Sequence, residues 1–471
     1  MDRKAGVLMP VSANISEYGI GDFGKSAYAF VDFIAEMGFS VWQVLPITTI
    51  GAGNSPYSGI SAFAGNYLLI DIDSLPESLA TQEEKNEAKH YDSAFRVCYD
   101  HAREFKRKVL LTAFSRIDSE TKALVSAFKK ENADWLNDYA SFMAKREKNP
   151  KDFYYYEQYI FFEQWFKLKE YANARGVSIF GDMPIYVSLD SVDVASNPTL
   201  FELDAKGKPT RVAGVPPDYF AEDGQLWGNP LYNYKEMEKD NYKWFVSRLT
   251  HNLKIYDYLR LDHFRGFYSY WAVPATAKTA KEGEWVKGFG AKIFKALEKV
   301  IKNPPLIAED LGIIDDNVAK FVKESGFPCM RVLHFAFDNK TTNPHLPFNY
   351  DTNTVAYTGT HDNNTTLGWL TEMDAGTRDG VLNFLDISGG WAVGGGDSPA
   401  VRSAIKQIIA SSARLAIIPM QDLAGYGADT RTNTPGVPLG NWEYRATSAS
   451  FYEVNNNFIL NLNRKYGRTN R

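Results

Sequence analysis

Four acidic residues stand at the ends of short apolar runs in this chain of 471 residues, where carboxylates could perform acid–base or nucleophilic chemistry. They are Asp262, Glu309 with its neighbour Asp310, and Asp362. A charged carboxylate at the end of an apolar strand is costly unless it is paired, because desolvation disfavours the charged form. A structural salt bridge is enough to explain any one of these residues. Acidic residues at the ends of three separate strands favour a functional site if the fold brings those strand ends together.

The neighbours of Asp262 and Glu309 predict different charge states for the two carboxyls. Arg260 lies two residues before Asp262, on the same face of a strand, where its charge would hold Asp262 ionised at neutral pH, as a carboxylate nucleophile requires. Glu309 follows the apolar residues 306–308, and a less polar setting would raise its pKa toward use as a general acid. Two carboxyls with separated pKa values are typical of a glycosidase pair.

The elements that must position these residues form a repeating pattern. Eight short runs rich in apolar and β-branched residues recur, and helical patterns separate most of them. The runs cover residues 6–12, 41–47, 177–187, 256–264, 304–312, 329–335, 354–362 and 415–423. Strand and helix that alternate in this way predict an α/β fold, a closed parallel (β/α)8 barrel with functional side chains at the carboxyl ends of the strands. An open doubly wound sheet is the alternative.

We expect residues 1–471 to form a single elaborated barrel domain with two insertions. Residues 66–175 contain no glycine and only two prolines, Pro76 and Pro150, so a mostly helical insertion is predicted between barrel strands 2 and 3. A second insertion is predicted over residues 188–250, between strands 3 and 4.

The composition excludes several classes of protein. Lys plus Arg number 52 and Asp plus Glu 57, a net charge of −5, so the chain has no strongly basic surface for nucleic acid. Cys98 and Cys329 are too few and too far apart for a disulfide framework or a zinc ribbon. No apolar run approaches the ~20 residues that cross a bilayer, and the first residues lack the apolar core of a signal peptide, so we expect an intracellular protein. The aromatic content of 14% fits a large core or a groove that stacks ligand rings.

Several long motifs, taken in order, resemble those of the 4-α-glucanotransferase family, the amylomaltases or disproportionating enzymes related to α-amylases. They are SPYSGISAFAGN (55–66), GDMPIYVSLDS (181–191), GVPPDYFAEDGQLWGNPLYNY (214–234), RLDHFRGF (260–267), IAEDLG (307–312), YTGTHDNNTT (357–366) and RTNTPGVPLGNWEYR (431–445). The resemblance covers nearly the whole chain. It implies an enzyme that moves α-1,4-glucan segments from a donor to the 4-hydroxyl of an acceptor glucan or glucose, in the cytoplasm or in the plastid stroma.

The resemblance also implies roles for single residues. Asp262 matches the family's nucleophile, Glu309 its acid/base, and Asp362 the aspartate that grips sugar hydroxyls near the reacting carbon. Three further residues match positions that support this trio: Arg260, His263 and His361.

Four residues resemble the family's contacts to the glucan. Tyr57 and Trp227 match residues that stack on sugar rings, and Asn229 and Asp190 match polar contacts. The second insertion would therefore carry glucan-binding loops.

Three positions carry a residue that differs from the one more common in the family. Phe348 stands where a histidine is frequent, Asn364 where an aspartate is frequent, and Cys329 where a glycine is usual. These departures bear on the details of the glucan sites and leave the three carboxylates unchanged.

The implied mechanism is a double displacement that retains the anomeric configuration through a glycosyl-enzyme. An α-amylase-like hydrolase that uses the same trio is one alternative, and a non-catalytic glucan-binding protein is another. A metal-dependent hydrolase is disfavoured because the seven histidines form no HxH or HExxH spacing. We expect no metal and no cofactor, and as partners only α-1,4-glucans and maltooligosaccharides.

Overall fold

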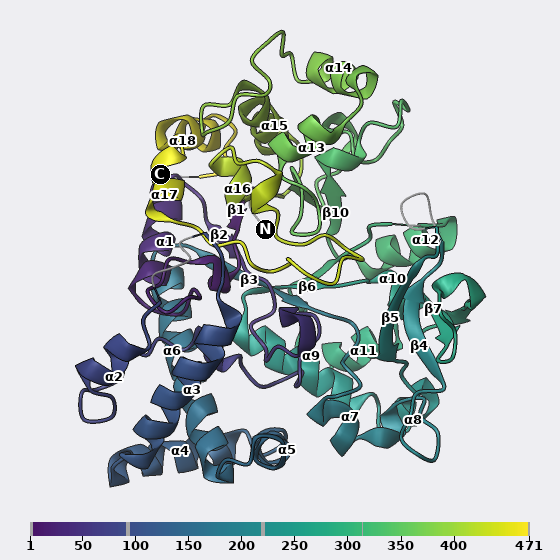
Figure 1. The fold of residues 1–471 in the computed structure, drawn as a ribbon. Helices are drawn as coiled ribbons and strands as arrows, with labels where there is room; N and C mark the ends of the chain where they lie inside the picture. Colours follow the sequence, from purple (N-terminus) through teal and green to yellow (C-terminus); the bar gives the residue numbers. More distant parts are fainter. Residues whose placement is uncertain (1–2, 91–94, 218–221, 313, 470–471) are drawn as a thin grey trace.

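A computed structural model describes residues 3–90, 95–217, 222–312 and 314–469 of the chain (Figure 1). Eight parallel strands close into a barrel in the order β1-β12-β11-β10-β9-β6-β3-β2. They are β1 (Lys4–Leu8), β2 (Val41–Gln43), β3 (Ser178–Met183), β6 (Tyr258–Leu261), β9 (Leu306–Ala308), β10 (Cys329–Val332), β11 (Thr354–Tyr357) and β12 (Leu415–Pro419). Seven strands lie within predicted runs, and β1 overlaps the first run but begins two residues before it, so the predicted (β/α)8 barrel is confirmed and the open sheet is excluded.

The strands are buried because helices cover the outside of the barrel. The helices that lie between or after the barrel strands in the chain include α1 (Lys25–Glu36), α9 (Lys243–Ile255), α11 (Lys292–Glu298), α12 (Asp316–Ser325), α13 (Thr366–Glu372), α14 (Ala375–Phe384), α15 (Pro399–Ala410) and α18 (Asn456–Lys465). Of these, α9 packs against β3 and β6, and α15 packs against β12. In α12, Val318, Phe321 and Val322 form the buried stripe, and the Asp315 carboxylate caps the helix by accepting from the backbone N–H of Asn317 and Val318.

The glycine-free segment between β2 and β3 folds mainly as helices, at the lower left of Figure 1. They are α2 (Gln82–Glu87), α3 (Tyr99–Ser115), α4 (Ser119–Glu131), α5 (Leu136–Glu147) and α6 (Lys151–Ala174). Helix α6 packs against α3, α4 and α5 on the side of the subdomain and against α1 and β3 on the side of the barrel. It buries Tyr154, Tyr156 and Trp165 completely, so many of the chain's aromatic side chains fill this junction.

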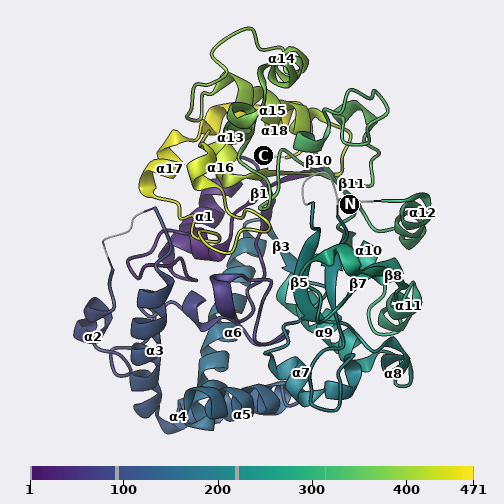
Figure 2. The same ribbon diagram turned by 45° about the vertical axis from the view of Figure 1, so that its right-hand side comes forward.

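A second, four-stranded sheet lies beside the barrel and was not predicted (Figure 2). Its antiparallel strands run in the order β5-β4-β7-β8 and are β4 (Arg211–Val215), β5 (Gln225–Pro230), β7 (Ser269–Pro274) and β8 (Glu284–Lys287). Two of them precede β6 and two follow it, so the sheet joins the segment 188–250 to residues beyond the motif at 260–267. The short helices α7 (Val192–Ser196), α8 (Tyr234–Glu238) and α10 (Arg265–Tyr268) connect it to the barrel.

Short elements complete the chain. They are α16 (Met420–Leu423), α17 (Ser448–Glu453) and the 3-10 helices η1 (Val11–Ala13), η2 (Ala52–Asn54), η3 (Tyr67–Leu69), η4 (Pro198–Leu200), η5 (Ala280–Glu282), η6 (Leu333–Phe335), η7 (Pro347–Asn349) and η8 (Ala428–Thr430). Within the described ranges, no helix combines the length and apolar character needed to span a membrane.

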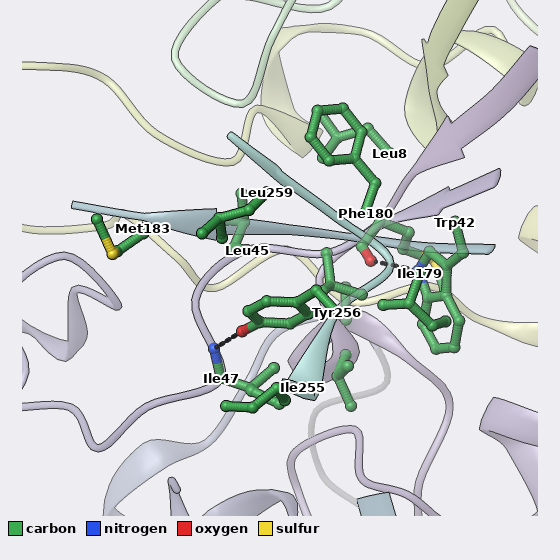
Figure 3. Packing of buried hydrophobic residues seen from close by; sticks show 14 of the residues in the cluster. Leu8, Trp42, Leu45, Ile47, Ile179, Phe180, Met183, Ile255, Tyr256 and Leu259 are labelled. Atoms are coloured by element: carbon green, nitrogen blue, oxygen red, sulfur yellow. Dashed lines mark hydrogen bonds between the residues drawn. The ribbon is translucent and has the colours of Figure 1, made fainter. Parts of the chain in front are cut away.

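The core under the site is closely packed around Tyr256 (Figure 3). The backbone N–H of Ile47 donates to the Tyr256 hydroxyl at 3.3 Å, which ties the loop after β2 to β6. Gly181 of β3 faces the Tyr256 ring, and a Cβ there would lie 2.2 Å from ring atoms, so only glycine allows this approach. This packing holds the loop after β2, strand β3 and the residue pair before β6 together beneath the site.

Candidate active site

The three predicted carboxylates come from the carboxyl ends of barrel strands. Asp262 directly follows β6, Glu309 directly follows β9, and Asp362 lies in the segment between β11 and α13. Strands β6 and β9 are neighbours in the barrel. Because the carboxyl ends of parallel strands meet at one face, the fold brings the three side chains to one mouth.

Asp262 is held by a buried arginine. Nη2 of Arg260 lies 2.9 Å from Oδ1 of Asp262, and Nη1 of Arg260 donates to both carboxylate oxygens of Asp182, at 2.8 and 2.7 Å. Asp182 and Arg260 are register partners on β3 and β6, and both are almost completely buried. Asp262 keeps 27% of its side chain exposed, as a group that must meet a substrate requires.

The charge state expected for Asp262 needs a correction. The ion pair with Arg260 is present, but burial raises the pKa of Asp262 to about 8, and the charges of Asp182, Glu309 and Asp362 add to that rise. Arg260 opposes the rise without reversing it. The expectation of an ordinary ionised aspartate was wrong because it counted one neighbour on the same strand and omitted desolvation and the carboxylates that other strands bring close.

Glu309 is oriented by the backbone. Its Oε2 accepts from the N–H of His263 at 2.7 Å, and its Oε1 accepts from the N–H of Leu311 at 2.7 Å. His263 has a positive φ of 50°, which turns its N–H toward the carboxyl. Burial raises the pKa of Glu309 although Arg260 and the two backbone donors oppose this, so the predicted direction for this carboxyl is confirmed.

Asp362 is the most open of the three, with 40% of its side chain exposed. Its Oδ1 accepts from Nδ2 of Asn433 at 2.6 Å, and its backbone carbonyl accepts from Arg431 at 2.6 Å. Nε2 of His361 lies 3.3 Å from Oδ2. Burial lowers the pKa of His361, so this histidine is a neutral hydrogen-bonding partner at neutral pH.

Tyr57 lies in the mouth but is half-buried, unlike an open platform. Its hydroxyl donates to Oδ2 of Asp182 at 2.8 Å and lies 2.9 Å from Nε2 of His361. Its ring stacks on His361, with centroids 5.3 Å apart and planes inclined by 13°, and Trp442 lies 5.6 Å away. Tyr57 therefore contacts both Asp182, which pairs with the arginine that holds Asp262, and His361, which lies beside Asp362.

Trp227 is on β5, where 38% of it is exposed. The edge-to-face contact of its indole with the His263 ring, at 4.9 Å, places it beside the residue that follows Asp262. Asn229 of the same strand donates to the carbonyl of Val187 at 3.0 Å. The second sheet thus delivers both residues to the mouth from one strand.

Asp190 has a different environment. Its Oδ1 pairs with Nη1 of Arg146 on α5 at 2.7 Å, and 71% of its side chain is exposed. The structure links Asp190 to the helical subdomain, and its predicted contact with glucan stays a prediction.

The three residues that differ from those common in the family lie in different parts of the structure. Phe348 is 66% exposed on η7, and Cys329 is buried at the start of β10. Asn364 is buried under the Asp362 segment, and its Oδ1 accepts from the N–H of Thr365 at 2.8 Å. Asp310, the remaining strand-end carboxylate, accepts from the N–H of Met330 at 2.8 Å and pairs with Arg331, which is a structural role.

Sequence reasoning missed two residues of the site. Asp182 lies inside β3, one residue before its last residue, so it is a carboxylate within an apolar run and not one that follows a strand as Asp262 and Glu309 do. Asn433 stands in a loop without periodicity, and no local pattern indicates its contact with Asp362. A pocket adjoins this site and is lined in part by Tyr57, Asp182, Tyr186 and Arg248. No group of three or more His, Cys, Asp or Glu side chains that could hold a metal ion occurs in the part of the chain that the structure describes.

Comparisons with known proteins agree with this geometry. Residues 9–152 and 144–450 match the model of a family described as 4-alpha-glucanotransferase. The 4-alpha-glucanotransferase of Aquifex aeolicus is 41% identical over 99% of this chain and 99% of its own length, and that of Clostridium butyricum is 38% identical over 98% of this chain and 100% of its own. Among solved structures, an amylomaltase from Streptococcus agalactiae in complex with acarbose is 36% identical, with a TM-score of 0.94 over 99% of this chain and 100% of that one.

Proposed function

Because the chain belongs to the 4-alpha-glucanotransferase family, and so is a glycosyltransferase that acts in glucan transfer, we propose how its own residues perform the reaction. The observation that carries the proposal is the pairing of Asp262 with Glu309 at the ends of adjacent strands. One carboxyl is bound to a buried guanidinium and the other is oriented by two backbone N–H groups.

In the first half-reaction, a carboxylate oxygen of Asp262 bonds to the anomeric carbon of an α-1,4-glucan while the glycosidic bond breaks. The carboxyl proton of Glu309 passes to the leaving 4-oxygen. The product is a glycosyl-enzyme and a shortened glucan. The raised pKa of Glu309 favours the protonated form from which this transfer occurs.

The active form carries one proton on the pair, held by Glu309, with Asp262 ionised. Two carboxyls that interact this strongly titrate as a unit, so the raised pKa of Asp262 describes the unliganded site. The cation that develops on the sugar ring favours the ionised form of Asp262 during the reaction, and Arg260 supports this form throughout.

Asp362 would accept hydrogen bonds from the 2- and 3-hydroxyls of the reacting sugar. Such bonds accelerate the reaction only if they strengthen as the ring flattens, because only differential binding of the transition state lowers the barrier. The contact with Asn433, at 2.6 Å, fixes the carboxylate for that purpose.

In the second half-reaction, the Glu309 carboxylate takes the proton of an acceptor 4-hydroxyl, whose oxygen bonds to the anomeric carbon and displaces Asp262. Water competes at ~55 M, so the acceptor must be held close to the intermediate for transfer to win. Trp227 is exposed beside His263 and offers a flat face for an acceptor ring.

The test is incubation with maltotriose alone. Transfer gives a ladder of longer maltooligosaccharides together with glucose, whereas hydrolysis gives only glucose and maltose. Asp262→Asn serves as the matched control, since it keeps the shape of the side chain and should give neither pattern. A product mixture without oligosaccharides longer than maltotriose would contradict the proposal in favour of the hydrolase, and unchanged maltotriose would favour a glucan-binding protein.

A further inference from the structure

A buried carboxylate that the mechanism does not use lies under the segment that carries Asp362. Asp422, in α16 directly after β12, is only 2% exposed. Its Oδ1 accepts from the N–H of Thr366 at 2.7 Å. Its Oδ2 accepts from the hydroxyl of Thr366 at 2.8 Å and from that of Thr358 at 2.5 Å.

These two threonines are the ends of one segment. Thr358 directly follows β11, Thr366 is the first residue of α13, and Asp362 lies between them. A single carboxylate therefore ties the segment at both ends. Inside it, Oδ1 of Asn363 accepts from the N–H and the hydroxyl of Thr360, both at 2.9 Å, so the turn around Asp362 is closed as well.

The residue before Asp422 makes a second tie, to a different segment. Nε2 of Gln421 donates to the carbonyl of Thr430 at 3.0 Å and to the hydroxyl of Thr432 at 2.9 Å. Thr432 precedes Asn433, whose side chain donates to the Asp362 carboxylate. Gln421 is 5% exposed, so like Asp422 it lies below the surface that a glucan would contact.

We propose that Gln421 and Asp422 are positioning residues that fix Asp362 from two sides, Asp422 through the segment that carries it and Gln421 through the loop that brings Asn433. The proposal rests on the role given above to Asp362. Neither residue touches the substrate, so their effect on transfer passes through the position of the Asp362 carboxylate.

Substitution of Asp422 should act in a graded way. Asp422→Ala removes the acceptor of three hydrogen bonds and leaves both ends of the segment untied. Asp422→Asn keeps the shape and one acceptor oxygen, which can still receive the N–H of Thr366, while the threonine hydroxyls can turn to accept from the new amide. Transfer should therefore fall in the order wild type, Asp422→Asn, Asp422→Ala.

A double-mutant cycle with Asp362→Asn separates positioning from plain stability. The measurement is fluoride release from α-maltosyl fluoride, well below the melting temperature of each variant. In the wild-type background, Asp422→Ala should lower kcat by at least about tenfold and change KM by less than about threefold. In the Asp362→Asn background, the same substitution should cost less than about twofold, because the group that it positions no longer works. Gln421→Ala should show the same coupling with a smaller loss.

Thr365→Ala is the matched control. The Thr365 hydroxyl caps the same helix, α13, by accepting from the N–H of Gly368 at 3.1 Å, so its loss weakens the helix start without touching the ties to Asp422. We expect a lowered melting temperature and a kcat within about twofold of wild type. If Thr365→Ala lowers kcat as much as Asp422→Ala, or if the losses from Asp362→Asn and Asp422→Ala are additive, the positioning role is overturned.

The cycle also distinguishes this inference from the proposed function. If Asp362→Asn alone leaves turnover unchanged, the role given to Asp362 fails. If Asp362→Asn is slow and Asp422→Ala adds its full loss to it, only the positioning role fails.

Discussion

The two sides of the catalytic mouth are built by different means. On the side of β6 and β9, Asp262 is held by the buried guanidinium of Arg260, and Glu309 by the N–H groups of His263 and Leu311. On the side of β11 and β12, Asp362 is held by side chains from loops, Asn433 above all, and keeps 40% of its side chain exposed.

This difference separates two tasks. Burial and charge act on the first side, where the pKa values of Asp262 and Glu309 are both raised. On the second side the carboxylate is more open to water and its hydrogen bonds set its direction. Substitutions around Asp262 and Glu309 should therefore alter proton transfer and bond formation. Substitutions around Asp362 should alter how tightly the transition state is bound.

The largest effect is expected from Asp262→Asn, which removes the proposed nucleophile from the first side. The amide has nearly the same shape but cannot form the glycosyl-enzyme, so turnover of maltotriose should fall by more than about 1,000-fold. Glucan binding, measured by calorimetry, should persist. Retention of more than about a tenth of the wild-type rate would rule out Asp262 as the nucleophile.

Glu309→Gln should slow transfer between natural glucans by about 100- to 10,000-fold, because the leaving 4-oxygen then departs without a proton. The loss should be much smaller for glycosylation by α-maltosyl fluoride, since fluoride needs little help from an acid. The comparison of the two donors in single-turnover experiments checks this. An equal loss with both donors would argue against Glu309 as the acid and for a role in holding the site together.

The pH dependence of kcat/KM should be set by Asp262 and Glu309 more than by the residues around Asp362. The pKa of Asp262 is raised to about 8 by burial and by the surrounding carboxylates, so the acid limb should lie well above pH ~4, where an ordinary aspartate titrates. Asn433→Ala removes no charge, so it should lower the plateau about tenfold and leave both limbs in place. An acid limb near pH ~4 in the wild type would show that the charge of Arg260 outweighs the effect of burial on the pKa of Asp262.

The sequence was sufficient to predict the barrel and its three carboxylates, because both depend on local patterns. Short apolar runs separated by helices predict parallel strands, and an acidic residue after such a run is visible without the fold. Asp182 does not carry this signal, because it lies inside its run and inside β3. Its partner Arg260 is adjacent only through the strand register, which a linear reading does not contain.

The features that were not predicted depend on contacts between distant segments. The second sheet pairs β4 with β7 although β6 lies between them in the chain, and its short strands β4 and β5 contain Gly214 and Gly228. The raised pKa of Asp262 comes from desolvation and from three carboxylates on other segments. Asn433 reaches Asp362 from a loop 71 residues later in the chain. Each of these features depends on contacts that form only in the folded chain, and not on any one run of residues.

The smallest effects are expected at the two aromatic residues predicted to contact sugar, and here the structure separates them. Trp227 is 38% exposed on the edge strand β5, so Trp227→Ala should leave the melting temperature within a few degrees of wild type. Tyr57 is half-buried, and its hydroxyl donates to Asp182, so Tyr57→Ala should lower the melting temperature more. Thermal unfolding of both variants tests this contrast.

The products should distinguish the two residues as well. Loss of an acceptor platform slows transfer more than hydrolysis, because water needs no platform and a sugar does. Trp227→Ala should therefore raise the ratio of new reducing ends to rearranged chains by about two- to tenfold, whereas Tyr57→Phe, which keeps the ring and removes only the hydroxyl, should leave the ratio nearly unchanged. If Trp227→Ala instead melts far below wild type with an unchanged ratio, the indole packs the second sheet and the acceptor is held elsewhere in the mouth.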